Sequence, residues 1–237
     1  MDFLSELQSR KILNLEYLYG MYFVKAPKWL RWIYHSLVWK IPGEDKVLYL
    51  TFDDGPHPQA TTFVLEQLSL YQAKASFFCI GKNVLEHPEI YDRIIAEGHR
   101  VGNHTQNHLN GWKVSEQAYL DNIEKAANYI HSNLFRPPYG RIKLQTIKKI
   151  KSLLRSKTTL SDPEHSPKII MWHVLSGDFD ERISAEKCFE NVIKNAEKGS
   201  IIVFHDSAKA WERLYQTLPR VLEYYAKMGF QFESIPG

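Results

Sequence analysis

Short apolar runs alternate with longer amphipathic stretches along the chain after about residue 46. The short runs have the length and composition of buried strands, and the longer stretches carry apolar residues at helical spacing. Strands that alternate with helices in this way are typical of an α/β fold with a parallel sheet or barrel. The seven expected strands span residues 47–52, 75–80, 100–103, 134–136, 169–174, 200–204 and 230–235.

The stretches between these strands predict helices. Ser115 and Ser184 stand directly before amphipathic segments and predict N-caps, and Pro88 fits a first helical turn, which tolerates a missing N–H. The polar segment 157–168 is a connection rather than a domain boundary, because the same alternation resumes after it. We therefore expect a single barrel domain over 46–237. The expected helices span residues 60–71, 88–97, 115–132, 144–156, 185–197 and 210–228.

Residues 1–45 precede the first expected strand and form an extension with a different composition. They hold three of the six tryptophans, Trp29, Trp32 and Trp39, among several lysines and arginines. Two interpretations are open. The extension can pack on the barrel as a helix whose basic side chains lie along apolar surface, which is the more common arrangement. Alternatively, it can lie on a membrane surface.

Composition and charge exclude several classes of protein. Of the 237 residues, 44% are apolar and 24% are charged, which is typical of a globular chain and unlike disordered, collagen-like or coiled-coil sequences. The net charge is +3 with both signs interspersed, so nothing in it supports nucleic-acid binding. No segment is long and apolar enough to predict a transmembrane helix.

The cysteines and the first residues of the chain indicate in which cellular compartment the protein is expected. Two cysteines are too few for a disulfide scaffold, and Cys79 lies in an apolar run, so we expect Cys79 and Cys188 to be buried thiols. The first residues lack the basic and apolar regions of a secretory signal. We therefore expect a cytoplasmic location, with association with the cell envelope as the alternative.

Polar and ionisable side chains follow several of the expected strands. The carboxyl ends of parallel strands all point to one face of a barrel, so the loops that leave them gather there. We therefore expect the catalytic or metal-binding residues to lie in these loops. The candidate residues at the strand ends are Asp53, Asp54, His104, His108, Arg136, Asp178 and His205.

Two of these residues have the spacing of metal ligands. His104 and His108 are four residues apart and can meet one cation if the segment turns helically. A carboxylate from another loop would complete a set of three protein ligands, which leaves a position for water and is typical of a catalytic metal site. The alternative for an isolated pair at this spacing is two solvated or capping histidines.

The other strand ends supply carboxylates and a guanidinium. On an extended chain Asp53 and Asp54 point in different directions, so one can bind a metal while the other faces the substrate. A plain Asp-Gly-Pro turn is the alternative. Arg136 precedes two prolines that stiffen its loop, and a fixed guanidinium can hold a carboxylate bidentately. Taken alone, such an arginine is more often part of a surface ion pair.

Three motifs in this order resemble those of the polysaccharide deacetylases, a carbohydrate esterase family that includes chitin, chitooligosaccharide and peptidoglycan N-acetylglucosamine deacetylases. The motifs are Thr-Phe-Asp-Asp-Gly-Pro at 51–56, His-Thr-Gln-Asn-His at 104–108 and Arg-Pro-Pro-Tyr at 136–139. The resemblance covers roughly residues 46–235. It implies a distorted (β/α)₇ barrel and a metal-dependent hydrolase that removes N-acetyl groups from an amino-sugar glycan.

The resemblance also assigns roles to individual residues. It implies that Asp53 is the general base and that Arg136 orients it. His205 would be the general acid, tuned by Asp178, and the Tyr139 backbone N–H would stabilise the oxyanion. The implied metal ligands are Asp54, His104 and His108, which would bind Zn²⁺ or, alternatively, Co²⁺ or Ni²⁺. The side chains expected to contact substrate are those of His57, Pro138, Tyr139, Phe179 and Val203.

The sequence departs from the family pattern at two motifs. The family's Leu-x-His is Val-Phe-His at 203–205, which keeps an aliphatic side chain behind the acid. The usual Asp-x-x-Asp-Trp is Leu-Ser-Gly-Asp-Phe at 175–179, so Leu175 and Phe179 alter the wall that faces the substrate. These changes leave the acetylated glycan undefined. An O-acetyl esterase, a hydrolase of another amide or formamide, and a non-catalytic glycan-binding module are the alternatives.

Overall fold

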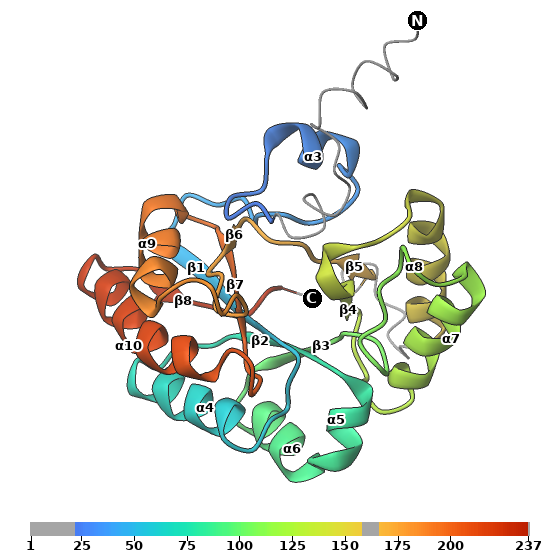
Figure 1. Ribbon diagram of the computed structural model, residues 1–237, viewed down its shortest axis with the longest axis horizontal. Helices are drawn as coiled ribbons and strands as arrows, with labels where there is room; N and C mark the ends of the chain where they lie inside the picture. The colour runs from blue at the N-terminus through green and yellow to red at the C-terminus, as the bar shows by residue number, and fades with distance from the viewer. Residues whose placement is uncertain (1–21, 158–165, 237) are drawn as a thin grey trace, which may run out of the picture.

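The computed structural model describes residues 22–157 and 166–236. Its strands form a curled, entirely parallel sheet in the order β5-β4-β3-β2-β1-β7-β6, and β8 pairs with β1 (Figure 1). This is a distorted α/β barrel, as the sequence predicts. The strands are β1 (Val47–Asp53), β2 (Ser76–Cys79), β3 (Arg100–Asn103), β4 (Leu134–Phe135), β5 (Lys168–Ile169), β6 (Val174–Leu175), β7 (Ile201–His205) and β8 (Gln231–Phe232).

The helices lie around the outside of the sheet (Figure 1). Their starts follow the local sequence: the Ser115 hydroxyl accepts a hydrogen bond from the Ala118 N–H, and Ser184 accepts one from the Lys187 N–H, as expected of N-caps. The helices are α3 (Lys28–Ile33), α4 (Ala60–Leu70), α5 (Gly81–Glu86), α6 (Pro88–Ala96), α7 (Glu116–Ala127), α8 (Ile147–Lys157), α9 (Ala185–Asn195) and α10 (Trp211–Lys227), with 3₁₀ turns η1 (Pro138–Gly140) and η2 (Leu144–Thr146).

The expected strand at 169–174 is wrong in detail, because it divides into β5 and β6. This part of the backbone pairs with the N-terminal extension: Val38 bridges Ile170, directly after β5, in parallel, and Lys25 bridges Val174, the first residue of β6, in antiparallel fashion. The Met171 N–H donates to the Val38 carbonyl at 2.7 Å. Hydrogen bonds to the extension thus replace a continuous sheet ladder, and no pattern in 169–174 alone could indicate this.

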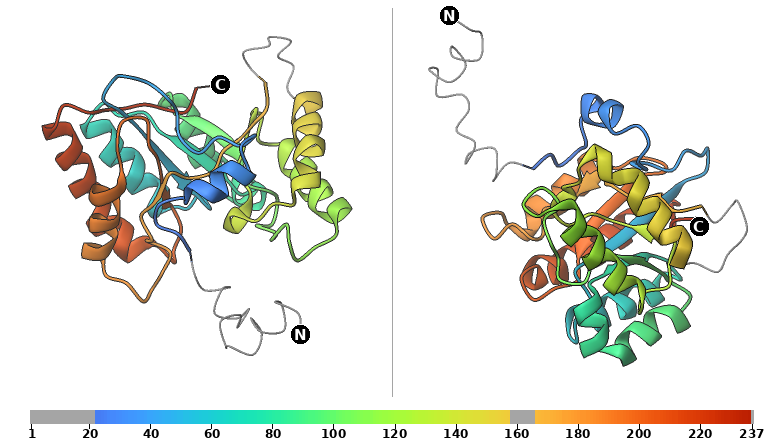
Figure 2. Two further views of the ribbon diagram at one scale, coloured as in Figure 1. Left: turned by 90° about the horizontal axis from the view of Figure 1, so that it is seen from above. Right: turned by 90° about the vertical axis from the view of Figure 1, so that its right-hand side faces the viewer.

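The extension lies against the sheet beside β5 and β6 (Figures 1 and 2). Trp39 is buried, and its indole N–H donates to the Tyr34 carbonyl. Trp29 and Trp32, on α3, are exposed. The segment therefore packs on the barrel through some of its aromatic residues and presents others to solvent. Residues 1–21 of the expected extension and 158–165 of the expected connection lie outside the described residues.

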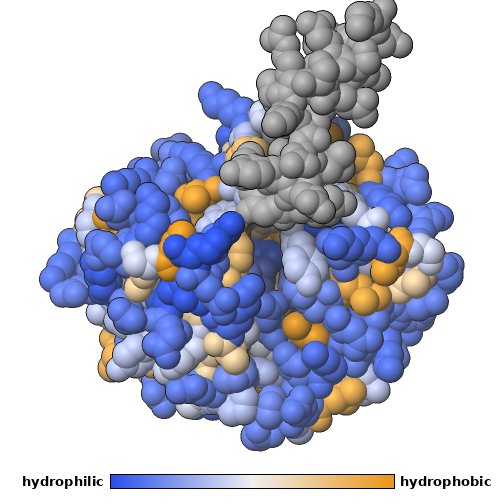
Figure 3. All heavy atoms as spheres, in the orientation of Figure 1, coloured by the Kyte–Doolittle hydropathy of each residue, from blue (hydrophilic) through white to orange (hydrophobic). Residues whose placement is uncertain are grey.

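Buried aromatic residues of neighbouring strands pack between the sheet and the outer helices, in one cluster with Val64 of α4 and Leu218 of α10. Phe52 of β1 stacks on Phe77 of β2 at 5.1 Å between ring centroids and on Phe204 of β7 at 6.0 Å. Cys79 and Cys188 are buried and free, as expected. The outer surface in Figure 3 is mostly hydrophilic, with apolar residues in small separate groups. Within the described ranges, no helix is both long and apolar enough to cross a membrane.

Candidate active site

Asp53 and His205 end neighbouring strands and are register partners. Asp53 is the last residue of β1, and His205 is the last residue of β7, which pairs with β1 in parallel. The Asp206 N–H donates to the Asp53 carbonyl at 3.0 Å, so the pairing continues one residue past β7. Parallel pairing thus brings together a carboxylate and an imidazole that lie 152 residues apart in the sequence.

The backbone turns sharply at Asp54, which separates the two adjacent carboxylates. Asp54 has a φ of 82°, in the left-handed region that is costly for a residue with a side chain. Its carbonyl accepts a hydrogen bond of 2.7 Å from the Asn83 amide, and its N–H donates to the Phe78 carbonyl at 3.3 Å. Asp53 consequently faces Arg136, whereas Asp54 faces His104 and His108.

Asp54, His104 and His108 form a candidate metal site. Asp54 Oδ1 lies 3.2 Å from His108 Nε2 and 3.7 Å from His104 Nε2, and the three donor atoms lie within 4.8 Å of one another. The expectation of a helical turn is wrong. Thr105 and His108 have φ values of 67° and 54°, so an irregular loop rather than a helix brings the two imidazoles together.

The residues fit a divalent metal. Asp54 Oδ1 is buried and has no hydrogen-bond partner within residues 22–157 and 166–236, which is costly for a carboxylate oxygen unless a cation compensates it. Burial and repulsion from His108 hold the pKa of His104 well below its ordinary value, and burial lowers the pKa of His108. Both imidazoles are therefore neutral at pH 7 and offer a nitrogen lone pair, as metal binding requires.

Neighbouring groups select which histidine nitrogen faces the site. His104 Nδ1 lies 2.7 Å from the Arg136 carbonyl, which can only accept, so Nδ1 carries the proton and Nε2 is free to bind metal. His108 Nδ1 lies 3.1 Å from the Tyr139 hydroxyl, which can hold this ring in the same way. This role of the Tyr139 side chain was not predicted, because the sequence gives no sign that loops 104–108 and 136–140 touch.

Arg136 is buried between Asp53 and the backbone of the chain before β6. Its Nη1 donates to Asp53 Oδ1 at 2.6 Å and to the Thr51 hydroxyl at 2.7 Å. Nη2 donates to the Met171 carbonyl at 3.0 Å, and the guanidinium carbon lies 4.0 Å from the centroid of the Phe78 ring. The expected bidentate contact with a carboxylate is therefore wrong. One nitrogen holds Asp53, and the remaining donors fix the guanidinium to the barrel.

His205 is bound twice by one buried carboxylate. Its Nδ1 donates to Asp178 Oδ1 at 2.9 Å, and its backbone N–H donates to Asp178 Oδ2 at 2.8 Å. The Ser176 hydroxyl also donates to Oδ1, at 2.9 Å. Burial alone would lower the pKa of His205, but the attraction of Asp178 and its hydrogen bond overcome this and raise it to about 9. His205 is therefore a cation at pH 7.

Comparisons with known proteins address the family of this chain. A family model described as polysaccharide deacetylase matches residues 40–154. A peptidoglycan-N-acetylglucosamine deacetylase of Bacillus cereus is 30% identical over 204 residues, which cover 84% of this chain and 91% of that protein. The chain belongs to the polysaccharide deacetylase family. The family predicted from the three motifs is thus confirmed.

Two further similarities extend this result. A chitooligosaccharide deacetylase of Azorhizobium caulinodans is 32% identical over 179 residues, covering 70% of this chain and 77% of that protein. The solved structure of the Bc1960 peptidoglycan N-acetylglucosamine deacetylase superposes with a TM-score of 0.75 and 28% sequence identity, covering 89% of this chain and 95% of that one. The similarity in fold therefore reaches well beyond residues 40–154.

In this polysaccharide deacetylase, the residues expected to contact substrate differ in their exposure to solvent. The Tyr139 side chain is 61% exposed, and Phe179 is half-buried, with its ring 5.0 Å from that of His205. His57 Nδ1 instead accepts a hydrogen bond from the Ala60 N–H at the start of α4. The side chains of Pro138 and Val203 are buried, so a direct substrate contact does not fit their positions.

Asp206 is a buried residue of the enzyme that the sequence reasoning missed. Its carboxylate accepts hydrogen bonds from the Gly55 N–H at 3.0 Å and from the Thr61 hydroxyl at 2.5 Å. It thus ties the loop that carries Asp54 to the end of β7 and to α4. The available signal was an acidic residue at the end of an expected strand, but no motif in the sequence links Asp206 to Gly55 or Thr61.

Proposed function

We propose that this polysaccharide deacetylase removes N-acetyl groups from N-acetylglucosamine units of a glycan or oligosaccharide, and that its metal is Zn²⁺, with Co²⁺ or Ni²⁺ as alternatives. The observation that carries the proposal is the buried Asp54 Oδ1, which has no hydrogen-bond partner in the described part of the chain and faces two neutral histidines beside Asp53 and His205. The peptidoglycan-N-acetylglucosamine and chitooligosaccharide deacetylases among its relatives support an amino-sugar substrate.

The donor set supports zinc. One carboxylate oxygen and two imidazole nitrogens are common ligands of catalytic zinc, and three protein ligands leave a position for water and substrate. Nitrogen and oxygen donors also accept Co²⁺ and Ni²⁺. When bound by Asp54, His104 and His108, such a metal supplies a water of lowered pKa and polarises the acetyl carbonyl.

The base in this mechanism is Asp53. It accepts the proton of the attacking water, and the hydrogen bond from Arg136 Nη1 fixes the orientation of its carboxylate. Because Asp54 turns away, Asp53 keeps an oxygen for this proton instead of binding the metal. The backbone N–H of Tyr139, in a turn with a φ of 59°, donates to the oxyanion that forms when water adds to the carbonyl.

The acid in this mechanism is His205. Breaking the carbon–nitrogen bond releases acetate and an amine, and an amine leaves only when its nitrogen is protonated. The cationic His205 donates that proton, and Asp178 holds the ring in place through Nδ1, which leaves Nε2 as the donor. This pair favours an amide substrate over an ester, because an alcohol depends less on a strong acid to leave.

The test is acetate release by the metal-loaded enzyme from N-acetylglucosamine oligomers and peptidoglycan beside O-acetylated xylan. The proposal expects faster release from the amino-sugar substrates. Release from xylan alone would favour an O-acetyl esterase. A stoichiometric metal with no turnover on these substrates, or on other amides and formamides, would favour a non-catalytic glycan-binding module.

A further inference from the structure

Helix α3 turns its apolar stripe outward. Trp29, Trp32 and Ile33 lie at helical spacing on one side and are 56%, 78% and 42% exposed. Leu30, on the other side, packs against the core cluster that includes Trp39. A surface helix of a globular protein normally buries its apolar stripe, so two exposed tryptophans side by side indicate a surface with a partner.

The charge around this stripe has one sign. Residues 22–43 contain no aspartate or glutamate, and they carry Lys25, Lys28, Arg31 and Lys40. Lys25 and Lys28 are exposed, while Lys40 forms an ion pair of 2.8 Å with Glu197. The exposed tryptophans therefore lie within a cationic segment, although the net charge of the whole chain is only +3.

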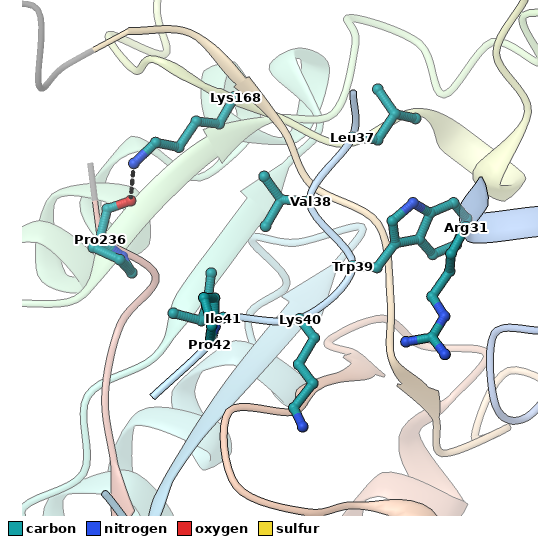
Figure 4. Close-up of a pocket in the computed structure, with 9 residues that line it drawn as sticks. All are labelled: Arg31, Leu37, Val38, Trp39, Lys40, Ile41, Pro42, Lys168 and Pro236. Atoms are coloured by element: carbon teal, nitrogen blue, oxygen red, sulfur yellow. Dashed lines mark hydrogen bonds between the residues drawn. The ribbon is translucent and has the colours of Figure 1, made fainter. Parts of the chain in front are cut away.

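A cavity of about 540 Å³ beside α3 also combines apolar and cationic side chains. Apolar side chains such as Leu37, Val38 and Ile41 line it, and Arg31 and Lys40 extend along it in the same direction (Figure 4). Arg31 Nε is buried and has no hydrogen-bond partner among the described residues. A buried, unsatisfied guanidinium nitrogen next to apolar surface fits an anionic group that arrives from outside.

We propose that residues 22–42 form a docking surface for an anionic lipid bilayer, with Trp29 and Trp32 at the level of the headgroups and Lys25, Lys28 and Arg31 against lipid phosphates. Tryptophan is enriched at membrane interfaces, and clustered lysines and arginines are attracted to anionic leaflets. A soluble polyanion would satisfy the cations but would leave the outward stripe of α3 in water. A bilayer accommodates both.

The docking surface begins next to the candidate active site. The Tyr22 ring lies 4.8 Å from the Phe179 ring, which in turn contacts His205, and the Phe23 ring lies 6.1 Å from that of Trp29. A bilayer bound by α3 would therefore hold the catalytic residues close to the membrane. This goes beyond the proposed deacetylation and does not depend on it.

The test is sedimentation of the full chain with vesicles of phosphatidylcholine alone or mixed with phosphatidylglycerol. We expect binding to the anionic vesicles only, and a loss of about tenfold or more in affinity for Trp29→Ser/Trp32→Ser and for Lys25→Glu/Lys28→Glu. Tyr215→Ser, at an aromatic side chain that is 52% exposed on α10, is the matched control for the first pair. Lys125→Glu/Lys148→Glu makes the same change in charge as Lys25→Glu/Lys28→Glu, and this control variant should bind the anionic vesicles as the wild type does.

Tryptophan quenching by brominated lipids separates the bilayer from other occupants. The wild-type chain should be quenched, and Trp29→Ser/Trp32→Ser should lose that quenching. Vesicle binding without quenching would identify a polyanion site and overturn the proposal. A dimer in sedimentation velocity that depends on Trp29 and Trp32 would also overturn the proposal. So would tryptophans that acrylamide fails to quench in the free full chain but quenches once residues 1–21 are removed.

Discussion

His205 and Asp178 are joined by two hydrogen bonds, one to the imidazole and one to the backbone N–H of the same residue. The double contact fixes both the position of the ring and its charge. A carboxylate that is completely buried can lie this close only if its partner compensates its charge, and His205 does so as a cation. The end of β7 and the imidazole that we propose as the acid therefore depend on the same carboxylate.

This pair predicts the alkaline limit of activity. The pKa of His205 is raised from 6.5 to about 9, so the cation persists at neutral pH and is lost as the pH rises through about 9. The stability that the charged pair contributes is complete below pH 6.5 and disappears over the same rise. We expect deacetylation to decline above about pH 9. In Asp178→Asn, whose side chain carries no charge, the decline should begin at least about one pH unit lower.

The measurement is kcat/KM against pH for the two proteins, beside unfolding at each pH to exclude loss of the fold. Ser176→Ala is a suitable control, because it removes a neutral donor to Asp178 and leaves the charge in place. An alkaline limb that stays at the same pH in Asp178→Asn would show that His205 is not the acid.

The adjacent aspartates predict different losses. Asp53→Asn should reduce turnover by about 10²-fold or more while about one divalent metal per chain remains bound, because it removes a base and not a ligand. Asp54→Asn and His104→Ala should instead lose the metal. Metal content and turnover, measured together for the three variants, check this division. Equal metal loss in Asp53→Asn and Asp54→Asn would contradict it.

Chelation extends the same test to the whole protein. Removing the metal should abolish turnover without unfolding the chain, because the barrel core is built from apolar contacts such as Phe52 with Phe77 and Phe204. Far-ultraviolet circular dichroism before and after chelation would record this. Loss of the fold would mean that the metal is structural.

The Tyr139 hydroxyl predicts an effect on metal affinity. Tyr139→Phe keeps the backbone N–H and the ring but removes the hydroxyl that lies 3.1 Å from His108 Nδ1. Groups that orient a ligand histidine typically change metal affinity by about 10- to 100-fold, so we expect a weakening in this range. Titration of the metal-free protein with Zn²⁺ measures it. Unchanged affinity would show that the hydroxyl does not hold His108.

The sequence could predict the chemistry at the strand ends because the α/β alternation and the motifs both have local signatures. Asp53, Asp54, His104, Arg136 and His205 each lie at or directly after the end of a strand that the apolar pattern indicates. The barrel and its order of strands and helices follow from the same alternation. The carboxyl ends of parallel strands share one face, so placing the residues along the chain was sufficient to place them together in space.

What could not be predicted depends on contacts between distant segments. Val38 replaces a strand neighbour at Ile170, so one expected strand became two. The loop that carries His104 and His108 has positive φ values at Thr105 and His108 instead of a helical turn. Asp206, which follows the neighbouring strand β7, accepts a hydrogen bond from the Gly55 N–H. Each of these depends on packing between residues far apart in the sequence, for which hydrophobic periodicity carries no signal.

Gly55 predicts a steric test of the loop that carries Asp54. A Cβ at Gly55 would lie 2.0 Å from Asp206 Oδ2, so Gly55→Ala must displace one of the two. Forcing an atom into a packed site costs about 1–3 kcal/mol, and we expect a loss of this size in the free energy of unfolding together with weaker metal binding. At Gly43, no atom of the described residues lies within 4 Å of such a Cβ. Gly43→Ala should therefore leave both quantities unchanged, and equal effects of the two variants would contradict the role of Asp206.

The final prediction separates the acid from the metal half of the site. His205→Ala should reduce hydrolysis of an N-acetylglucosamine oligomer far more than that of an activated aryl acetate, because an amine needs a proton to leave and a phenolate does not. A difference of about 10²-fold or more between the two reductions is expected from the usual contribution of general acids. The proposed metal ligands Asp54, His104 and His108 would serve both reactions, so protonation of the leaving group is the main difference between them. Kinetics of the variant and the wild type on both substrates, at equal metal content, measure this difference. If both rates fall by the same factor, His205 instead supports the structure or the oxyanion, and the leaving-group step assigned to it is wrong.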